Sequence, residues 1–165
     1  MATILGLDCK LYRGTAGTKA NTEMKNVTNV TLNLEKGEAD VTTRAAEGWK
    51  MFAATLKEAS IEFEMLYDPE DADFQAMQAA YFGNTAVAIF VSDGSGSGLD
   101  CDAVLTNFSE DQSLEEAVKV NVTLKPTNIG GANGRAPQWV IAGSGSGSGG
   151  RGGSGSGGSG SGSGN

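Results

Sequence analysis

The sequence contains no histidine. Histidine is the commonest general base and a frequent metal ligand, and it activates serine and cysteine nucleophiles, so its absence excludes those catalytic arrangements. The glycines give no nucleotide-binding pattern either, since Gly130, Gly131 and Gly134 follow the last expected strand without a helix signal after them. We therefore expect no enzyme, no catalytic residue and no cofactor.

Long apolar runs and clustered basic residues are also missing. No segment approaches the roughly 20 apolar residues that span a bilayer, and the N-terminus lacks the basic and then apolar pattern of a signal peptide. The formal net charge is −8 over 165 residues. Phosphate binding needs clustered Lys and Arg. We therefore expect no membrane association, no secretion through a signal peptide and no specific nucleic-acid binding.

Cysteine is scarce, with only Cys9 and Cys101, far apart in the chain. Two isolated cysteines form neither a disulfide framework nor a zinc site. Their strand phases place both on apolar faces, where a free cysteine behaves as a small hydrophobe. Buried thiols are favoured over a pair that joins the two strands or an engineered crosslink.

The composition divides the chain at residue 143. Residues 143–165 are almost purely Gly and Ser, which is typical of a flexible linker with a relaxed span of about 25 Å. Residues 1–142 suit one domain. The whole chain has a formal charge of −8, and Arg151, the only charged residue of the tail, contributes +1. Residues 1–142 therefore carry −9. A second Gly/Ser stretch, residues 94–98, resembles a flexible replacement for a loop.

Alternation of apolar and polar residues with period two dominates residues 1–142 and predicts half-buried strands. A turn is expected at Lys36-Gly37, followed by a weaker returning strand over residues 38–44. A second turn is expected at Lys57-Glu58, after an extended segment from residue 49 to 56. The apolar phases that define the strands are Leu5, Leu7, Cys9 and Leu11; Val30, Leu32 and Leu34; Ile61, Phe63 and Met65; Val87, Ile89 and Val91; Cys101, Ala103 and Leu105; and Val118, Val120, Val122 and Leu124.

One segment has helical spacing. Residues 68–71 combine a capping residue, a proline suited to the first helical position and acids suited to the first turn. We predict a helix over residues 69–82 and attribute its acids to capping rather than to a metal site. Asp100 and Asp102 are expected on one face of a strand, and with Asp93 they offer a weak calcium site. Their spacing matches no calcium loop, so a solvated face is favoured.

The expected fold is mainly β, with two packed antiparallel sheets in a sandwich or barrel-like arrangement and one α-helix. Such a fold leaves edge strands that must be blunted or paired. Residues 35–48 and 126–141 could be given to neighbouring subunits. The second stretch ends in Trp139, Val140 and Ile141, which either cover their own core or bind another subunit.

Several stretches resemble the phage major tail tube proteins, a family related in fold to the tube protein of type VI secretion. The resemblance covers about residues 2–141, and VTLNLEKGEADVTTR at 30–44 is its most specific part. The other stretches are residues 4–13, 56–65, 71–74, 115–118 and 124–127.

The resemblance implies hexameric rings that stack into a hollow tube in the virion tail, assembled in the host cytoplasm. One sheet of each subunit would line a shared inner barrel, and the lumen would hold a tape-measure protein and then pass DNA. The loop after the second strand would reach the adjacent ring. The assembly residues implied for that loop are Glu35, Lys36, Gly37, Glu38, Asp40, Arg44 and Trp49, and those of the C-terminal arm are Trp139, Val140 and Ile141.

Three features depart from the family pattern: the stretch at residues 94–98, the two cysteines and the Gly/Ser tail. Together they favour a tube engineered or domesticated as a nanotube or scaffold. The alternative from another functional class is a monomeric β-sandwich that serves as a binding or display module. Assembly that depends on concentration would separate the two.

Overall fold

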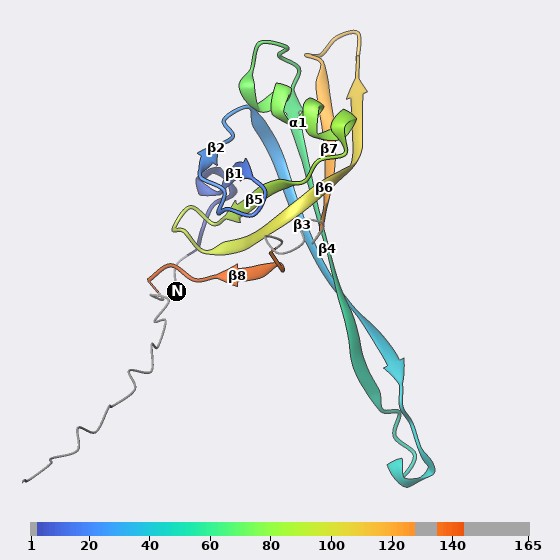
Figure 1. Ribbon diagram of the computed structural model, residues 1–165. Helices are drawn as coiled ribbons and strands as arrows, with labels where there is room; N and C mark the ends of the chain where they lie inside the picture. The colour runs from blue at the N-terminus through green and yellow to red at the C-terminus, as the bar shows by residue number, and fades with distance from the viewer. Residues whose placement is uncertain (1–2, 128–134, 144–165) are drawn as a thin grey trace, which may run out of the picture.

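The computed structural model describes residues 3–127 and 135–143. A rounded body carries one long hairpin that projects from it (Figure 1). In chain order the elements are η1 (Gly6–Asp8), β1 (Lys10–Thr15), β2 (Thr22–Glu23), β3 (Val27–Asp40), η2 (Arg44–Ala46), β4 (Phe52–Leu66), α1 (Ala72–Gly83), β5 (Val87–Ser92), β6 (Gly98–Asp111), β7 (Lys119–Pro126) and β8 (Gln138–Val140).

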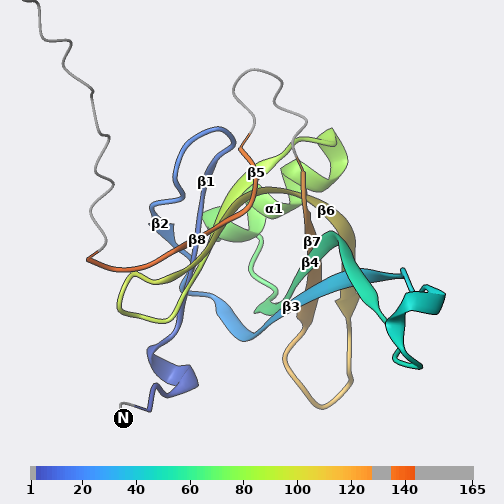
Figure 2. The ribbon, with the colours of Figure 1, turned by 90° about the horizontal axis from the view of Figure 1, so that it is seen from below.

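The strands form one antiparallel sheet in the order β2-β1-β5-β6-β7-β4-β3, and β8 pairs with β6. This confirms a mainly β fold with one helix, and the two expected sheets are joined into one sheet that curls on itself (Figure 2). The long strand β6 makes the connection, because it pairs with β5 from Gly98 to Ala103 and with β7 from Ala103 to Asp111. A register shift between Leu105 and Asn107 marks a bulge, which bends a strand and increases its twist.

The core lies inside the curl. The period-two pattern of β4 and β7 is confirmed, since their inward side chains are almost completely buried and those between them face outward. The helix closes the core from one side with Phe74 and Met77, and the Phe74 ring centroid lies 5.8 Å from that of Phe108. The buried residues of the two strands are Ile61, Phe63, Met65, Val120, Val122 and Leu124.

The helix begins at Ala72, so the predicted start at residue 69 was three residues early. Asp71 is the N-cap, and one of its carboxylate oxygens accepts a hydrogen bond from the Phe74 amide at 3.2 Å. Asp68 instead accepts from the amide of Glu70 at 3.0 Å and closes a separate turn. Helix capping, predicted for the acids as a group, is therefore confirmed for Asp71. Asp73, in the first turn, instead forms an ion pair with Arg13 at 2.6 Å.

The N-terminal prediction was wrong. Residues 6–8 form a 3-10 turn, and β1 starts only at Lys10. Leu7 is 91% exposed and Cys9 is exposed. Of the residues that the alternation predicted to be buried, only Leu11 is buried. Cys101 is buried as predicted, and both cysteines are free thiols.

The two turns predicted at Lys36-Gly37 and Lys57-Glu58 are absent from the structure. Strand β3 runs on to Asp40 and β4 starts at Phe52, so one long hairpin replaces two short ones. A register shift between Lys36 and Glu38 places a bulge at Gly37. A Cβ atom at Gly37 would meet the Thr55 hydroxyl, so a larger residue there requires the Thr55 side chain to move.

In the described part of the chain, no helix is long and apolar enough to cross a membrane. The glycines expected in a loop, Gly130, Gly131 and Gly134, lie outside the described residues, and so do residues 144–165 of the tail.

Candidate functional site

The projecting hairpin, residues 33–58, is called the arm. It is two-stranded for most of its length, because β4 pairs with β7 only from Ile61 onward. Every arm residue is exposed except Ala46. An isolated two-stranded hairpin is marginally stable in water, and three strands or a packed face are needed for independent stability. The arm therefore lacks a core of its own within one subunit.

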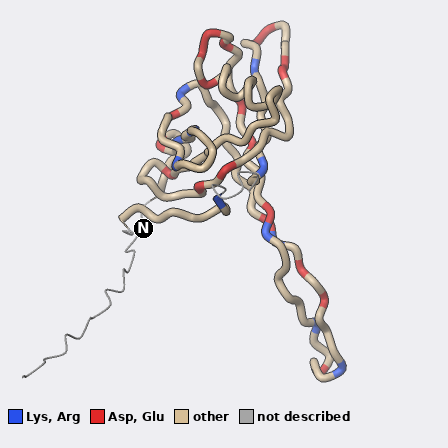
Figure 3. The backbone as a smooth tube through the Cα atoms, viewed as in Figure 1, with Lys and Arg blue, Asp and Glu red and all other residues tan. Residues whose placement is uncertain are grey.

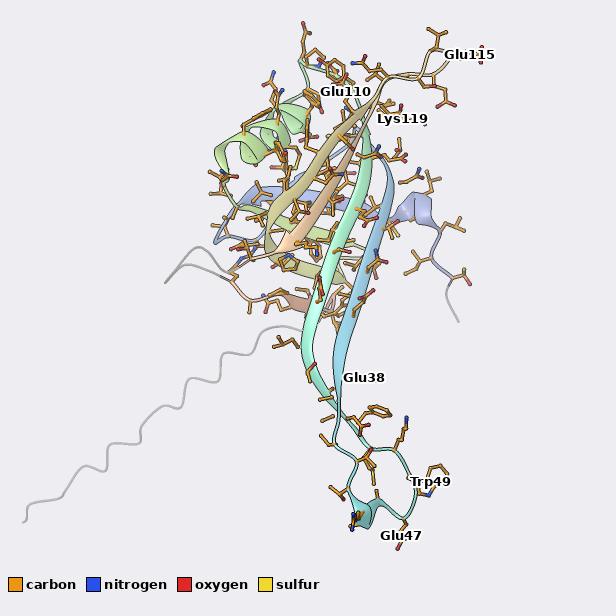
Figure 4. All side chains as sticks on the ribbon, turned by 90° about the vertical axis from the view of Figure 1, so that its right-hand side faces the viewer. Glu38, Glu47, Trp49, Glu110, Glu115 and Lys119 are labelled. Atoms are coloured by element: carbon orange, nitrogen blue, oxygen red, sulfur yellow. The ribbon has the colours of Figure 1, made fainter. Side chains whose placement is uncertain are left out.

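The arm contains all seven residues predicted for the ring-stacking loop. Five of them, Glu35 to Glu38 and Asp40, lie on β3, Arg44 lies in the short helix η2, and Trp49 follows at the tip (Figure 4). The tip, residues 41–51, folds back through hydrogen bonds. The amide of Val41 donates to the Met51 carbonyl, and the amide of Trp49 donates to the Ala46 carbonyl, both at 2.9 Å.

The tip exposes apolar surface. The Trp49 side chain is 76% exposed, and Val41 and Met51 are 49% and 51% exposed; Phe52, which follows the tip on β4, is 53% exposed. Exposed apolar patches are a common feature of protein interaction sites. Asp40 supports the turn because its carboxylate accepts from the amide of Thr42 at 2.9 Å, and hydrogen bonds from Thr42 lower the pKa of Asp40.

The shaft of the arm places like charges opposite each other. Glu35 faces Glu58 across the two strands, and Lys36 faces Lys57. Like charges directly opposite on neighbouring strands are destabilising. Lys125 relieves the acidic pair, since its Nζ lies 3.0 Å from Glu58 Oε1. Lys36 and Lys57 are exposed and have no carboxylate partner within ion-pair distance among the described residues.

The C-terminal residues predicted as an assembly arm pair with their own subunit. Strand β8 adds to β6 with Val140 opposite Gly98 and Trp139 opposite Leu99. The backbone of this segment therefore covers its own subunit. The side chains of Trp139 and Ile141 remain 58% and 59% exposed.

An apolar groove of about 680 Å³ separates β8 from the root of the arm. The Trp139 side chain lines one wall and Leu34 lies on the other. Its remaining lining comes from Glu35, Lys36, Lys57, Glu58, Ala59, Leu99, Lys125, Pro126 and Pro137.

A buried ionic cluster fixes the start of this C-terminal segment to the body. Arg135 Nη1 lies 2.8 Å from Asp100 Oδ2, and Nη2 lies 2.9 Å from Asp102 Oδ1. Both aspartates are only 3% exposed. Asp102 Oδ2 also accepts from the amide of Gly17 at 2.9 Å. The cluster therefore ties β6, the β1–β2 loop and the segment before β8 together.

The prediction of a solvated face for Asp100 and Asp102 was wrong, although they do share one face. Arg135 occupies that face and desolvates both carboxylates. Burial acts to lower the pKa of Arg135, but the hydrogen bonds to Asp102 and Asp100, together with the negative charges of both carboxylates, raise it overall. Among the described residues no group of three or more acidic, Cys or His side chains could hold a metal ion. Sequence reasoning missed Arg135, whose signal was a lone basic residue in a Gly-rich segment.

The Gly/Ser stretch at residues 94–98 forms an ordered turn rather than a flexible link. Asp93 Oδ1 accepts from the amides of Ser95 and Ser97 at 2.8 and 3.1 Å. The Ser95 hydroxyl also donates to Asp93 Oδ1 at 2.7 Å; this bond first, and then the backbone bonds, lower the pKa of Asp93. Gly98 has φ +153°, and a Cβ there would collide with the carbonyl of Val91.

Residues 9–127 match the phage tail tube protein family. No curated protein matches the chain significantly.

Solved structures give the same picture of the fold. The tail of an empty gene transfer agent particle with C6 symmetry is similar at TM-score 0.68 and 15% identity, covering 84% of this chain and 100% of that one. The SPP1 tail tube is similar at TM-score 0.59 and 14% identity, covering 84% and 81%. The baseplate of an anti-feeding prophage gives TM-score 0.55 and 8% identity, covering 85% and 97%.

Proposed function

Because this chain belongs to the phage tail tube protein family, and is thus a structural subunit of a virion tail, we propose that six copies close into a ring and that these rings stack into a hollow conduit. The observation that carries the proposal is the arm, which has an exposed apolar tip and no core in its own subunit. Such a hairpin gains stability only when another copy covers it.

Ring closure uses the edges of the curled sheet. Strand β3 forms one edge and pairs only with β4 among the described residues, so one backbone edge of this 14-residue strand is open. A long open edge is a template for pairing with another chain. The short strand β2 forms the opposite edge. Two unlike edges make a head-to-tail contact, which gives a ring when the rotation closes. The C6 symmetry of the similar tail supports six subunits.

Stacking uses the arm residues from Glu35 to Trp49, which project beyond the body and can reach an adjacent ring (Figure 1). The C-terminal arm residues Trp139, Val140 and Ile141 make a second contact between subunits, chiefly through the exposed side chains of Trp139 and Ile141, since Val140 is partly buried in its own subunit. Apolar burial at both places supplies the driving force, at about 25 cal/mol per Å² of buried area.

The conduit passes DNA without holding it. The chain has a net charge of −8, which repels phosphates, whereas phosphate binding needs clustered Lys and Arg. We further propose that the lumen first holds a tape-measure protein, that assembly takes place in the host cytoplasm, and that the role is structural rather than enzymatic.

Size-exclusion chromatography with light scattering tests ring formation. A species with six times the mass of the chain, or larger particles whose fraction rises with concentration, is the expected result. A single species with the mass of one chain at every concentration would reject the proposal. That result would support a monomeric binding or display module instead.

A further inference from the structure

The end of the body opposite the arm has a loop of unusual composition. The β6–β7 loop and its flanks, residues 110–119, are called the acidic loop. They hold four acids, Glu110, Asp111, Glu115 and Glu116, against Lys119 alone, a formal charge of −3. Figure 4 shows Glu110, Glu115 and Lys119 at one end of the molecule and Glu47 and Trp49 at the other.

The acidic loop also carries a completely unprotected apolar side chain. Leu114 is 99% exposed, more than any other large apolar residue described. It makes no contribution to the core of its own subunit. A leucine surrounded by acids at the tip of a loop suits insertion into an apolar surface with a basic rim.

The arm tip provides such a surface. Its apolar side chains include Trp49 and Met51, and its charged residues are Arg44, Lys50 and Glu47, a formal charge of +1. Figure 3 shows several acidic segments in the loops at the end away from the arm, and both basic and acidic segments along the arm. Among the described residues, no carboxylate lies within ion-pair distance of Arg44 or Lys50.

The acidic loop has unused charge of the opposite sign. Glu116 pairs with Lys119 at 3.5 Å, and Glu110 accepts a hydrogen bond from Gln112 at 2.6 Å. Glu115 forms no ion pair within the described part of the subunit. The two ends therefore match in both respects: each has exposed apolar side chains, and the unpaired Arg44 and Lys50 of the arm tip are opposite in sign to the acidic loop, where Glu115 is unpaired and acids exceed Lys119 by three charges.

We infer that the arm tip of one copy binds the acidic loop of a second copy in the adjacent ring. Leu114 packs against Trp49 and Met51, while Arg44 and Lys50 face Glu115 and Glu116. This rests on the proposed stacking function and names its receptor. Because the two surfaces lie at opposite ends of the molecule, the contact is head-to-tail and repeats without limit along one axis. Contact between two acidic ends is disfavoured by charge repulsion.

Charge reversal tests the contact. In the E115K/E116K variant we expect rings that no longer stack, seen by electron microscopy as loss of tubes. Adding R44E and K50E restores the attraction with its signs exchanged, so tubes should return. Leu114→Ser should also reduce stacking and leave the melting temperature of the subunit unchanged, since this side chain touches nothing within it. Tubes that persist in E115K/E116K and Leu114→Ser would overturn the inference.

A crosslink locates the contact directly. With Cys9→Ser as background, the double variant Trp49→Cys/Leu114→Cys should form a ladder of covalent multimers on mild oxidation. A disulfide requires Cβ atoms about 3.5–4.5 Å apart. The matched control is Leu56→Cys/Leu114→Cys, because Leu56 is 85% exposed on the same arm but lies on the shaft. It should form no ladder.

The outcomes separate the two proposals. Tubes of the unmodified chain, together with no ladder from the Trp49→Cys/Leu114→Cys variant, would reject the acidic loop as receptor and retain the tube. An unmodified chain that stays monomeric would reject the tube itself, and the receptor with it.

Discussion

Replacing Arg135 by methionine would leave the buried carboxylates of Asp100 and Asp102 without their counter-charge. Methionine keeps much of the apolar volume of the side chain but makes none of the bonds at 2.8 and 2.9 Å. Asp100 Oδ1 is already buried without a hydrogen-bond partner in the described structure, so this carboxylate has no local donor in reserve. The substitution therefore exposes the full cost of two desolvated negative charges.

Breaking a buried ion pair by removing one partner typically costs 3–5 kcal/mol, so we expect a loss of about 3–5 kcal/mol in the free energy of unfolding. At about 2–4 °C per kcal/mol for a domain of this size, the melting temperature should fall by about 6–20 °C. Because assembly raises apparent stability, all variants are compared at one protein concentration and with the same oligomeric state.

Urea unfolding followed by circular dichroism measures the effect. The matched control is Lys10→Met, which removes the exposed ion pair with Glu23 at 3.5 Å and should cost less than about 1 kcal/mol. Neutralising both acids in the same chain, as Arg135→Met with Asp100→Asn and Asp102→Asn, should recover more than half of the loss. An Arg135→Met variant within about 1 kcal/mol of the parent would refute the buried-cluster reasoning.

Three further predictions concern local features. With a thiol reagent such as Ellman's, the native protein should titrate the exposed Cys9 alone and the unfolded chain both cysteines; two reactive thiols in the native state would contradict the burial of Cys101. Burial, then the charges of Asp100 and Asp102, raise the pKa of the Cys101 thiol from 9.0 to about 12. The folded state therefore holds the thiol proton more tightly than the unfolded state. The resulting contribution to the free energy of unfolding is complete below pH 9 and is lost as the pH rises toward 12. Between pH 9 and 12 the free energy of unfolding should decline by up to about 1.4 kcal/mol per pH unit. The free energy of unfolding of a Cys101→Ala variant should decline less steeply, and equal slopes would contradict the raised pKa of Cys101. Asp71→Ala removes the helix cap and should cost about 1 kcal/mol in chemical denaturation, whereas no change would show that the bond to the Phe74 amide contributes nothing.

Much of the β framework could be predicted from the sequence, because side-chain alternation depends directly on which face of a strand is buried. The alternation of β7 is the clearest, and Val120, Val122 and Leu124 are all buried. The family resemblance added the tube fold and the arm residues, which periodicity alone does not provide.

The errors in the predicted strands and turns came from segments that have no buried face. Lys36-Gly37 and Lys57-Glu58 look like turns because polar residues and glycine interrupt an apolar pattern, yet both belong to a strand pair exposed on both faces. Burial cannot enforce a pattern there, so sequence periodicity carries no information about where the hairpin ends. The same reasoning explains Leu7, which has strand-like spacing in a 3-10 turn.

The buried cluster was missed for a different reason. Asp100 and Asp102 were correctly placed on one face, but their partner lies 33 residues beyond Asp102, after the glycine-rich stretch that follows β7. Contacts of this range depend on the path of the whole chain, so the only local signal, a lone basic residue in a Gly-rich segment, does not identify its partners. A solvated face is the usual place for two aspartates, since charged residues are rarely buried without a partner.

Electron microscopy of the purified protein tests the central claim most directly. The account predicts hollow tubes built from stacked rings, with six-fold symmetry in end views and in the helical reconstruction, and with the arm of each subunit reaching the next ring. Particles with the size of one chain, or a ring closed without any use of the open β3 edge, would contradict it.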